Sequence, residues 1–434
     1  MKLFFSYGHD QNAEIVERIK KDIEARRDVK VYIDTEFNNR GGIDWRRNIT
    51  EKIMDSDIMV AFASKHSVRD PGVCLDELTI AVCVKGALVQ SVLLEKNVTP
   101  PNNVGYKEYI DMSDWRNMID RPDFEEWYEE KLQKIIDAVS SKKIRRYADE
   151  IEYLRNVLCP DLSSIKKDRL KNEVYCERDW LSEKVQKWIE DENAPHIMLI
   201  DGPPGTGKSS FMAHEFMFNA SVGAIIFCEW DNPNFNNMDV ISRNLIFHLA
   251  TRYPDYRQQV LAYLKEENDR QKNEGGALRI GGRDLFKQLV VNRLRNLING
   301  DRPMLLILID GADELQDDSG SGRKKNVLAE LLQDEVKNLP EWVRFVVTSR
   351  PDAKVIRPLE DAYVVHLDEE ANRNDDVRRY LEYELCDKNT NRYNDKVLNK
   401  LTELCSGNFL FAKIACDALK KNVISLEDIK NGQQ

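Results

Sequence analysis

The stretch His196-Ile-Met-Leu-Ile-Asp-Gly-Pro-Pro-Gly-Thr-Gly-Lys-Ser-Ser-Phe211 predicts a buried strand, a glycine-rich loop and a helix in direct succession. The apolar run His196–Ile200 has the length of a buried strand, and the sequence becomes helical after Ser209. Between them lies the spacing Gly-x-x-x-x-Gly-Lys-Ser, which is a phosphate-binding loop pattern. A glycine-rich turn that binds nothing is the alternative, and the order of strand, loop, Lys-Ser and helix disfavours it.

Each residue type in this loop has a mechanical reason. Glycines let the backbone turn tightly, so that several N–H groups converge on one anion, and the following helix adds its positive N-terminal end. We expect Lys208 to reach the β- and γ-phosphates of a nucleotide and the Ser209 hydroxyl to complete a Mg²⁺ shell. The predicted nucleotide-binding residues are Gly202, Gly205, Thr206, Gly207, Lys208, Ser209, Ser210 and, from a later strand, Arg350.

A second apolar run, Met304–Ile309, ends in an acidic cluster. Its length and its flanks predict a buried parallel strand with carboxylates at its C-terminal end. We expect Asp310 to be the second protein ligand of Mg²⁺, beside Ser209. Glu314 is placed to polarise an attacking water, with Asp313 assisting. The alternative is an acidic turn after a core strand, which the upstream phosphate loop disfavours.

A third apolar run, Arg344–Ser349, ends at Arg350. A cation at the end of a buried strand can report whether a γ-phosphate is present. A satisfied surface arginine is the alternative interpretation of the same residue.

The first hundred residues alternate between apolar runs and amphipathic stretches. This rhythm predicts a doubly wound parallel sheet, whose site lies beyond the C-terminal ends of the strands. The expected strands are 2–6, 29–33, 58–63 and 88–94, and the expected helices are 11–26, 45–54 and 74–83.

Four boxes in this region resemble, in order, those of a TIR domain over residues 1–140: LFFSY (3–7), FNNRGGIDWRRNI (37–49), SDIMVAFAS (56–64) and VCLDEL (73–78). The resemblance implies a flavodoxin-like fold and self-association through the loop that holds Gly41-Gly42. It also implies that Glu77 cleaves the bond between nicotinamide and ribose in NAD⁺. The chain departs from the pattern at Val73, where the family often has an aromatic residue.

The chemistry implied for Glu77 is physically reasonable. Nicotinamide already carries positive charge on its ring nitrogen, so it leaves without a general acid. A carboxylate beneath the oxocarbenium-like ribose supplies the opposite charge, so one glutamate suffices. The alternative is that Glu77 belongs to an exposed acidic helix surface beside Asp76.

The boxes GPPGTGKSS, LLILIDGADEL and FVVTSRP resemble the Walker A, Walker B and sensor 1 boxes of NACHT-type signal-transduction ATPases. The segment CERDWLSEKVQKWIED (176–191) resembles the approach to such domains, and CSGNFLFAKIA (405–415) resembles their small helical subdomain. The resemblance implies ATP or ADP with Mg²⁺ as ligands. Related ATPases often carry Gly-Leu-Pro where this chain has Gly407-Asn408-Phe409, so a proline contact to the nucleotide is missing.

Together these features predict an α/β protein with a TIR domain (1–140), a helical linker (141–170), a NACHT P-loop NTPase domain (171–370) and a helical subdomain (371–434). The resemblance implies an NLR-like defence receptor that assembles as a homo-oligomer through both domains. ATP-linked assembly would then start NAD⁺ cleavage, with slow ATP hydrolysis as a timer. In the alternative, the TIR domain only recruits other TIR proteins. The trigger, the oligomer size and the choice between hydrolysis and cyclisation of NAD⁺ stay open.

Composition bounds the partners and the compartment. The chain has 434 residues with a formal net charge of -11, which argues against a general nucleic-acid binder. Its eight cysteines show no paired spacing, so we expect reduced thiols in a cytoplasmic protein, and no apolar run is long enough to span a membrane. No long repeat follows the helical tail, so we expect either a fragment of a longer receptor or a short member sensed by a partner.

Overall fold

The computed structural model describes residues 1–33, 49, 52–53, 55–68, 74, 77–78, 81, 88–98, 109–140, 142–160, 178–219, 221–230, 237–272, 280–297, 304–315, 325–385, 395–421 and 423. The chain divides into two compact units. The first holds residues 1–167, 217–220 and 246–279, and the second holds 168–216, 221–245 and 280–434. Gly41-Gly42 and Val73 lie outside the described residues.

The first unit is built on a five-stranded parallel sheet with the order β2-β1-β3-β4-β5. The central strand β3 is buried along its whole length, as expected of a parallel strand that is covered on both faces. The order reverses between β1 and β3, which makes the C-terminal ends of these strands the expected place for a site. The bounds are β1 Lys2–Ser6, β2 Lys30–Ile33, β3 Ile58–Ala63, β4 Leu88–Leu93 and β5 Ile110–Asp111.

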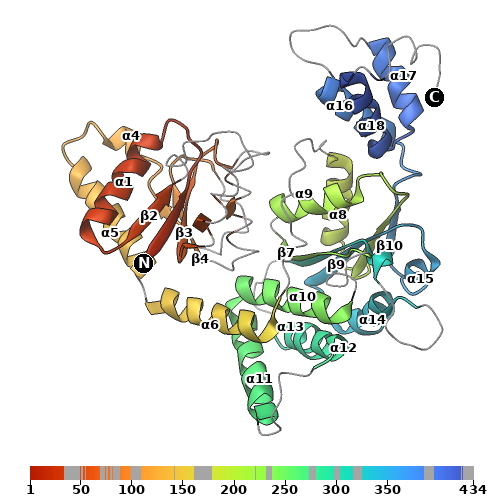
Figure 1. The fold of residues 1–434 in the computed structure, drawn as a ribbon, viewed down its shortest axis with the longest axis horizontal. Helices are drawn as coiled ribbons and strands as arrows, with labels where there is room; N and C mark the ends of the chain where they lie inside the picture. Colours follow the sequence, from red (N-terminus) through yellow and green to blue (C-terminus); the bar gives the residue numbers. More distant parts are fainter. Residues whose placement is uncertain are drawn as a thin grey trace. The chain divides into compact units, whose positions relative to one another are not determined.

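Amphipathic helices cover one face of this sheet. Helix α1 (Ala13–Arg26) buries the four residues Ile15, Val16, Ile19 and Ile23. These pack with α4 (Trp115–Met118), α5 (Phe124–Ser140) and the strands in one hydrophobic core. Figure 1 shows the three helices gathered on the same side of the sheet.

Two long helices complete the first unit. Helix α6 (Lys142–Leu158), which lies in the predicted linker, packs against α11 (Pro254–Lys272). Glu150 of α6 accepts hydrogen bonds from Arg257 Nε and Gln258 Nε2, both at 2.9 Å. The predicted domain boundaries themselves stay predictions.

The second unit is built on another five-stranded parallel sheet, with the order β10-β6-β9-β8-β7. Strands β6 to β9 are buried throughout, which is why each reads in the sequence as a continuous apolar run. The order brings the C-terminal ends of β6, β9 and β8 side by side. The bounds are β6 Ile197–Asp201, β7 Val222–Phe227, β8 Leu305–Asp310, β9 Val343–Ser349 and β10 Tyr363–His366.

Helices lie on both sides of the second sheet, with α8 and α9 on one side and α12 and α14 on the other (Figure 1). Apart from α11, the helices before β6 and between the strands are α8 Asp179–Glu190, α9 Lys208–Phe218, α10 Met238–Arg252 (whose residues from 246 onward belong to the first unit), α12 Gly282–Leu285, the π-helical turn Phe286–Val291, α13 Asn292–Arg295, the 3₁₀ turn Ala312–Glu314, α14 Val327–Glu335, the 3₁₀ turn Val336–Asn338 and α15 Ala353–Ile356.

Three helices after β10 form a small bundle with its own hydrophobic core. They are α16 (Arg373–Leu385), α17 (Asp395–Cys405) and α18 (Phe409–Lys420). The predicted fold class is therefore confirmed: two parallel-sheet α/β units, the second followed by a helical subdomain.

Candidate functional site

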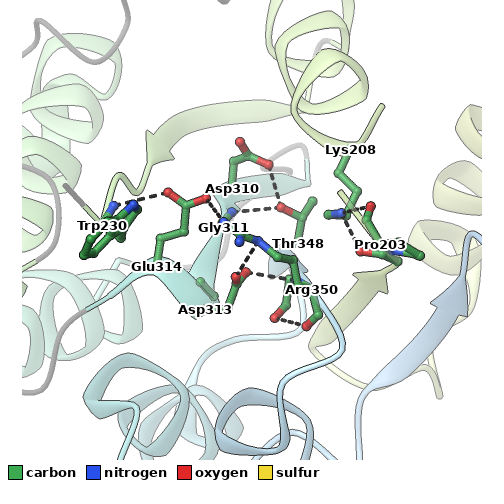
Figure 2. Close-up of polar contacts among 12 residues, drawn as sticks. Pro203, Lys208, Trp230, Asp310, Gly311, Asp313, Glu314, Thr348 and Arg350 are labelled. Atoms are coloured by element: carbon green, nitrogen blue, oxygen red, sulfur yellow. Dashed lines mark hydrogen bonds and ion pairs between the residues drawn. The ribbon is translucent and has the colours of Figure 1, made fainter. Parts of the chain in front are cut away.

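The predicted phosphate loop joins the end of β6 to the start of α9. Gly205 and Gly207 have φ angles of 84° and 81°, a backbone conformation that side chains with a Cβ rarely adopt. Lys208 turns back over the loop, and its Nζ donates to the carbonyl oxygens of Gly202 at 2.6 Å and Pro203 at 3.0 Å (Figure 2). The ammonium group thus lies within the loop, where it could contact a bound phosphate.

The environment of Lys208 disfavours its charge. Burial lowers the pKa of the ammonium group, and the nearby carboxylates of Asp310 and Asp313 oppose that shift only in part. An anion bound here would oppose this shift and favour the charged form of Lys208. The role of Lys208 in nucleotide binding stays a prediction.

Asp310 ends β8 and is 2% exposed. The hydroxyl of Thr348, on the neighbouring strand β9, donates to Asp310 Oδ1 at 2.5 Å and accepts from the N–H of Gly311 at 2.9 Å. Thr348 therefore fixes the carboxylate and the turn that follows it. Sequence patterns assign this threonine no role, because its position in a buried strand does not indicate which residue of a neighbouring strand it binds.

Arg350 follows β9 and binds both of the predicted hydrolytic carboxylates. Its Nε lies 3.1 Å from Asp313 Oδ2, and its Nη2 lies 2.6 Å from Glu314 Oε1. The hydrogen bond with Glu314 is the largest cause of a raised Arg350 pKa. The other oxygen of Glu314 accepts from the backbone N–H of Trp230 at 3.2 Å, so both oxygens of this carboxylate have donors (Figure 2). Arg350 is therefore an ion-paired arginine whose side chain is 47% exposed, and its role as a reader of the γ-phosphate stays a prediction beside that of a satisfied surface arginine.

A cavity of about 460 Å³ opens beside this ion-pair cluster. It is lined by Trp230, Asp313, Glu314, Arg350, Pro351, Asp352 and Ala353. Trp230, one of these lining residues, is 62% exposed. Nothing in the sequence marked Trp230, because it lies between β7 and α10, outside the three boxes.

The remaining predicted residues lie in or near the first turn of α9. Thr206 is buried and its hydroxyl donates to the Pro203 carbonyl at 2.9 Å, whereas Ser209 is exposed and Ser210 half-buried. Within the described parts of the chain, no three histidine, cysteine or acidic side chains cluster as a metal site. A Mg²⁺ ion at Ser209 and Asp310 would therefore need phosphate or water oxygens to fill its shell.

Glu77 lies in the first unit and is 3% exposed. Ser6, the last residue of β1, donates a hydrogen bond from its hydroxyl to Glu77 Oε2 at 2.5 Å. Near it, the Cys74 thiol lies 3.1 Å from the carbonyl oxygen of Tyr7. The interpretation of Glu77 as part of an exposed acidic surface is wrong. The carboxylate is instead held at the C-terminal edge of the sheet, where a doubly wound fold carries its site.

Comparison with protein families gives two matches, one in each half of the chain. Residues 3–130 match the family described as TIR domain. The N-terminal part of the chain is a TIR domain. Residues 176–350, which contain the phosphate loop and the carboxylate cluster, match the family described as Nephrocystin 3, N-terminal. The chain thus joins a TIR domain to an NTPase-like α/β unit, and the NACHT assignment of that unit stays a prediction.

Comparison with solved structures returned NtrX from Brucella abortus, crystallised in complex with ATP, at 10% identity and a TM-score of 0.31, over 96% of this chain and 79% of that one. This similarity is too low to bear on the site. The search of the curated proteins found no match. None of the helices in the described residues is both long enough and apolar enough to cross a membrane.

Proposed function

We propose that this protein is a nucleotide-switched, NLR-like receptor whose TIR domain cleaves NAD⁺ when copies of the chain assemble in response to ATP. The observation that carries the proposal is the clamp of Arg350 on Asp313 and Glu314. Arg350 follows β9, which lies beside β6, the strand that leads into the phosphate loop. The trigger stays unidentified. Homo-oligomerisation through both domains and a cytoplasmic location belong to the same proposal.

The clamp makes the γ-phosphate a competitor for Arg350. A γ-phosphate carries more negative charge than either carboxylate, so it draws the guanidinium away from Glu314 and Asp313. ADP lacks this group and leaves the clamp closed. The two nucleotides therefore favour two arrangements of the same side chains, which is what a switch requires.

The same clamp accounts for slow ATP hydrolysis. Glu314 is a weaker base toward water while Arg350 neutralises its charge and the Trp230 N–H holds its other oxygen. Hydrolysis therefore waits for Arg350 to leave and for Asp313 and Glu314 to turn toward the water. Ser209 and Asp310 would hold Mg²⁺, which neutralises charge on the phosphates when bound.

For NAD⁺, Glu77 would act by its charge. The bond between ribose C1 and the nicotinamide nitrogen breaks, its electron pair neutralises the ring nitrogen, and positive charge develops on the ribose. The Glu77 carboxylate, oriented by Ser6, lies in a buried environment where an opposite charge is stabilised more strongly than in water. Water or a second nucleophile then adds to C1.

The second candidate function is a scaffold, in which the TIR domain recruits other TIR proteins and cleaves nothing. Two observations favour it: Val73 replaces an aromatic residue that the family often carries, and Glu77 is only 3% exposed. A carboxylate this buried reaches a ribose only after neighbouring segments move. In this function the nucleotide switch is unchanged.

Nicotinamide release separates the two functions. Purified wild type and Glu77→Ala are incubated with NAD⁺ in the presence of ATP and of ADP. The enzymatic proposal expects release by the assembled wild type and none by the variant. Equal nicotinamide release by wild type and Glu77→Ala would contradict the enzymatic proposal and favour the scaffold function.

A further inference from the structure

The turn between α17 and α18 reaches the phosphate loop and holds it from outside. Asn408 Nδ2 donates to the carbonyl oxygen of Pro204 at 2.9 Å, and the backbone N–H of Phe409 donates to that of Gly205 at 2.8 Å. These are the positions where related ATPases often carry Leu-Pro. A proline in place of Phe409 has no N–H and cannot make the second bond.

Arg178, at the approach to α8, holds the next carbonyl. Its Nη2 donates to the Thr206 oxygen at 2.7 Å, and its guanidinium lies 4.8 Å from the centre of the Phe409 ring. The carbonyls of Pro204, Gly205 and Thr206, three in succession, are therefore all bound by groups outside the loop.

This pattern fixes the direction of the loop amides. In a trans peptide the C=O and the following N–H point in opposite directions within one plane. Holding three successive carbonyls outward therefore turns the N–H groups of Gly205, Thr206 and Gly207 to the other side. Convergent N–H groups are what binds phosphate in such a loop.

Arg178 is itself anchored on the helical subdomain. Its Nε lies 3.1 Å from Asp376 Oδ2 in α16, and the two side chains are 3% and 0% exposed. Asp376 also accepts from Trp180 Nε1 at 3.1 Å and from Arg379 Nη2 at 2.9 Å. A buried pair held from several sides keeps one geometry, and the loss of one partner leaves the other charge uncompensated.

The Asn408 side chain also lies close to the Cα of Gly205. A Cβ built on it would lie 2.3 Å from Asn408 Oδ1, and its φ is 84°. A side chain at position 205 would therefore displace the Asn408 amide from the loop, besides straining the backbone.

We infer that the helical subdomain shapes the phosphate loop, with Arg178 and Asn408 as positioning residues, so that nucleotide affinity and docking of α16–α18 are thermodynamically linked. The inference rests on the proposed nucleotide binding. By linkage, a bound nucleotide holds the subdomain against the loop to the same extent that the docked subdomain strengthens binding.

The test uses Asn408→Ser in the full chain. Asn408 is also the N-cap of α18, where its side chain accepts from the N–H groups of Leu410 and Phe411. Serine is an equally good N-cap but lacks the amide donor to Pro204, so the helix is kept and the loop contact is lost. Arg178→Lys is the second variant, which keeps the charge near Asp376 without the fork that also reaches Thr206. Glu370→Gln is the control, since Glu370 binds Lys184 of α8 and does not reach the loop.

ADP affinity is measured by titration, and hydrogen exchange of α18 is measured with and without ADP. We expect Asn408→Ser and Arg178→Lys each to weaken ADP binding about tenfold. We also expect both variants to reduce the protection that ADP gives α18, and Glu370→Gln to behave as wild type. If wild type binds ADP and Asn408→Ser binds it equally well, the inference is overturned and the proposed function stands. If wild type does not bind ADP, both are overturned.

Discussion

The two candidate sites hold their carboxylates in different ways. In the TIR domain a hydroxyl, that of Ser6, donates to Glu77. In the P-loop unit a guanidinium, that of Arg350, binds Asp313 and Glu314. Both sites lie at the C-terminal edge of a parallel sheet, and all three carboxylates act by their negative charge in the proposed chemistry.

The difference lies in what each partner does to that charge. A hydroxyl orients a carboxylate without cancelling its charge, so Glu77 is suited to face a developing cation. A guanidinium cancels the charge and must leave before the carboxylate can act, so Glu314 is suited to be released by a competing anion. In the proposed function, the first site therefore serves NAD⁺ cleavage and the second serves control by the nucleotide.

The largest effect is expected where the charge itself acts. Glu77→Gln keeps the shape and the Ser6 contact but removes the charge, so we expect NAD⁺ cleavage to fall about a hundredfold or more. Nicotinamide release by the assembled protein measures it. The control is Glu130→Gln, which removes a charge from the exposed surface of α5. Turnover in Glu77→Gln within a few fold of wild type would remove the contrast between the two sites.

Lys208→Ala comes next. The variant removes the cation that lies within the loop, and we expect ATP and ADP affinity each to fall about tenfold to a hundredfold. Titration with labelled nucleotide reports the loss. Lys187→Ala is the matched control, because Lys187 on α8 is exposed and, among the residues that the structure describes, forms its ion pair with Glu183 of its own helix. A similar loss in both variants would show that general surface charge holds the nucleotide.

Arg350→Ala tests whether this arginine distinguishes ATP from ADP. The guanidinium meets a γ-phosphate in ATP but has no such partner in ADP, so the variant should lose about tenfold in ATP affinity and little in ADP affinity. The ratio of the two dissociation constants is the measurement. An unchanged ratio would mean that Arg350 serves only to neutralise Asp313 and Glu314.

The smallest effect is a pH dependence. Burial lowers the pKa of Lys208, and phosphate binds the charged form. ADP affinity should therefore be highest below that lowered pKa and decline severalfold as the pH rises through it. Lys208→Arg, which does not titrate, should bind with no such decline. A decline that persists in Lys208→Arg would assign the titration to another group.

The sequence was sufficient for the parts that depend on local pattern. Continuous apolar runs predicted the buried strands β6, β8 and β9, and the residues after them are the chemical groups of the P-loop site. The order of boxes predicted the TIR domain before any contact was known. In both units the strands are parallel, so the residues that follow them lie together at one edge of the sheet, where a site is expected.

Contacts between residues far apart in the chain could not be predicted from the sequence. Ser6 and Glu77 meet across the first sheet, Thr348 bridges two strands, and Arg178 binds Asp376 of α16. Such pairs depend on strand order and on helix docking, which periodicity does not contain. Gly407-Asn408-Phe409 was predicted as a missing proline contact, whereas the structure gives Asn408 and Phe409 hydrogen bonds to the loop itself.

In the proposed function, the nucleotide site governs assembly and, through assembly, the activity of the TIR domain. The most direct test follows particle mass by light scattering and nicotinamide release in the same sample, with ATP, with ADP and with no nucleotide. We expect wild type to assemble and to cleave NAD⁺ with ATP but not with ADP or without nucleotide. We expect Lys208→Ala to do neither under any of the three conditions. Equal assembly and equal NAD⁺ cleavage in Lys208→Ala and wild type would contradict the proposed function.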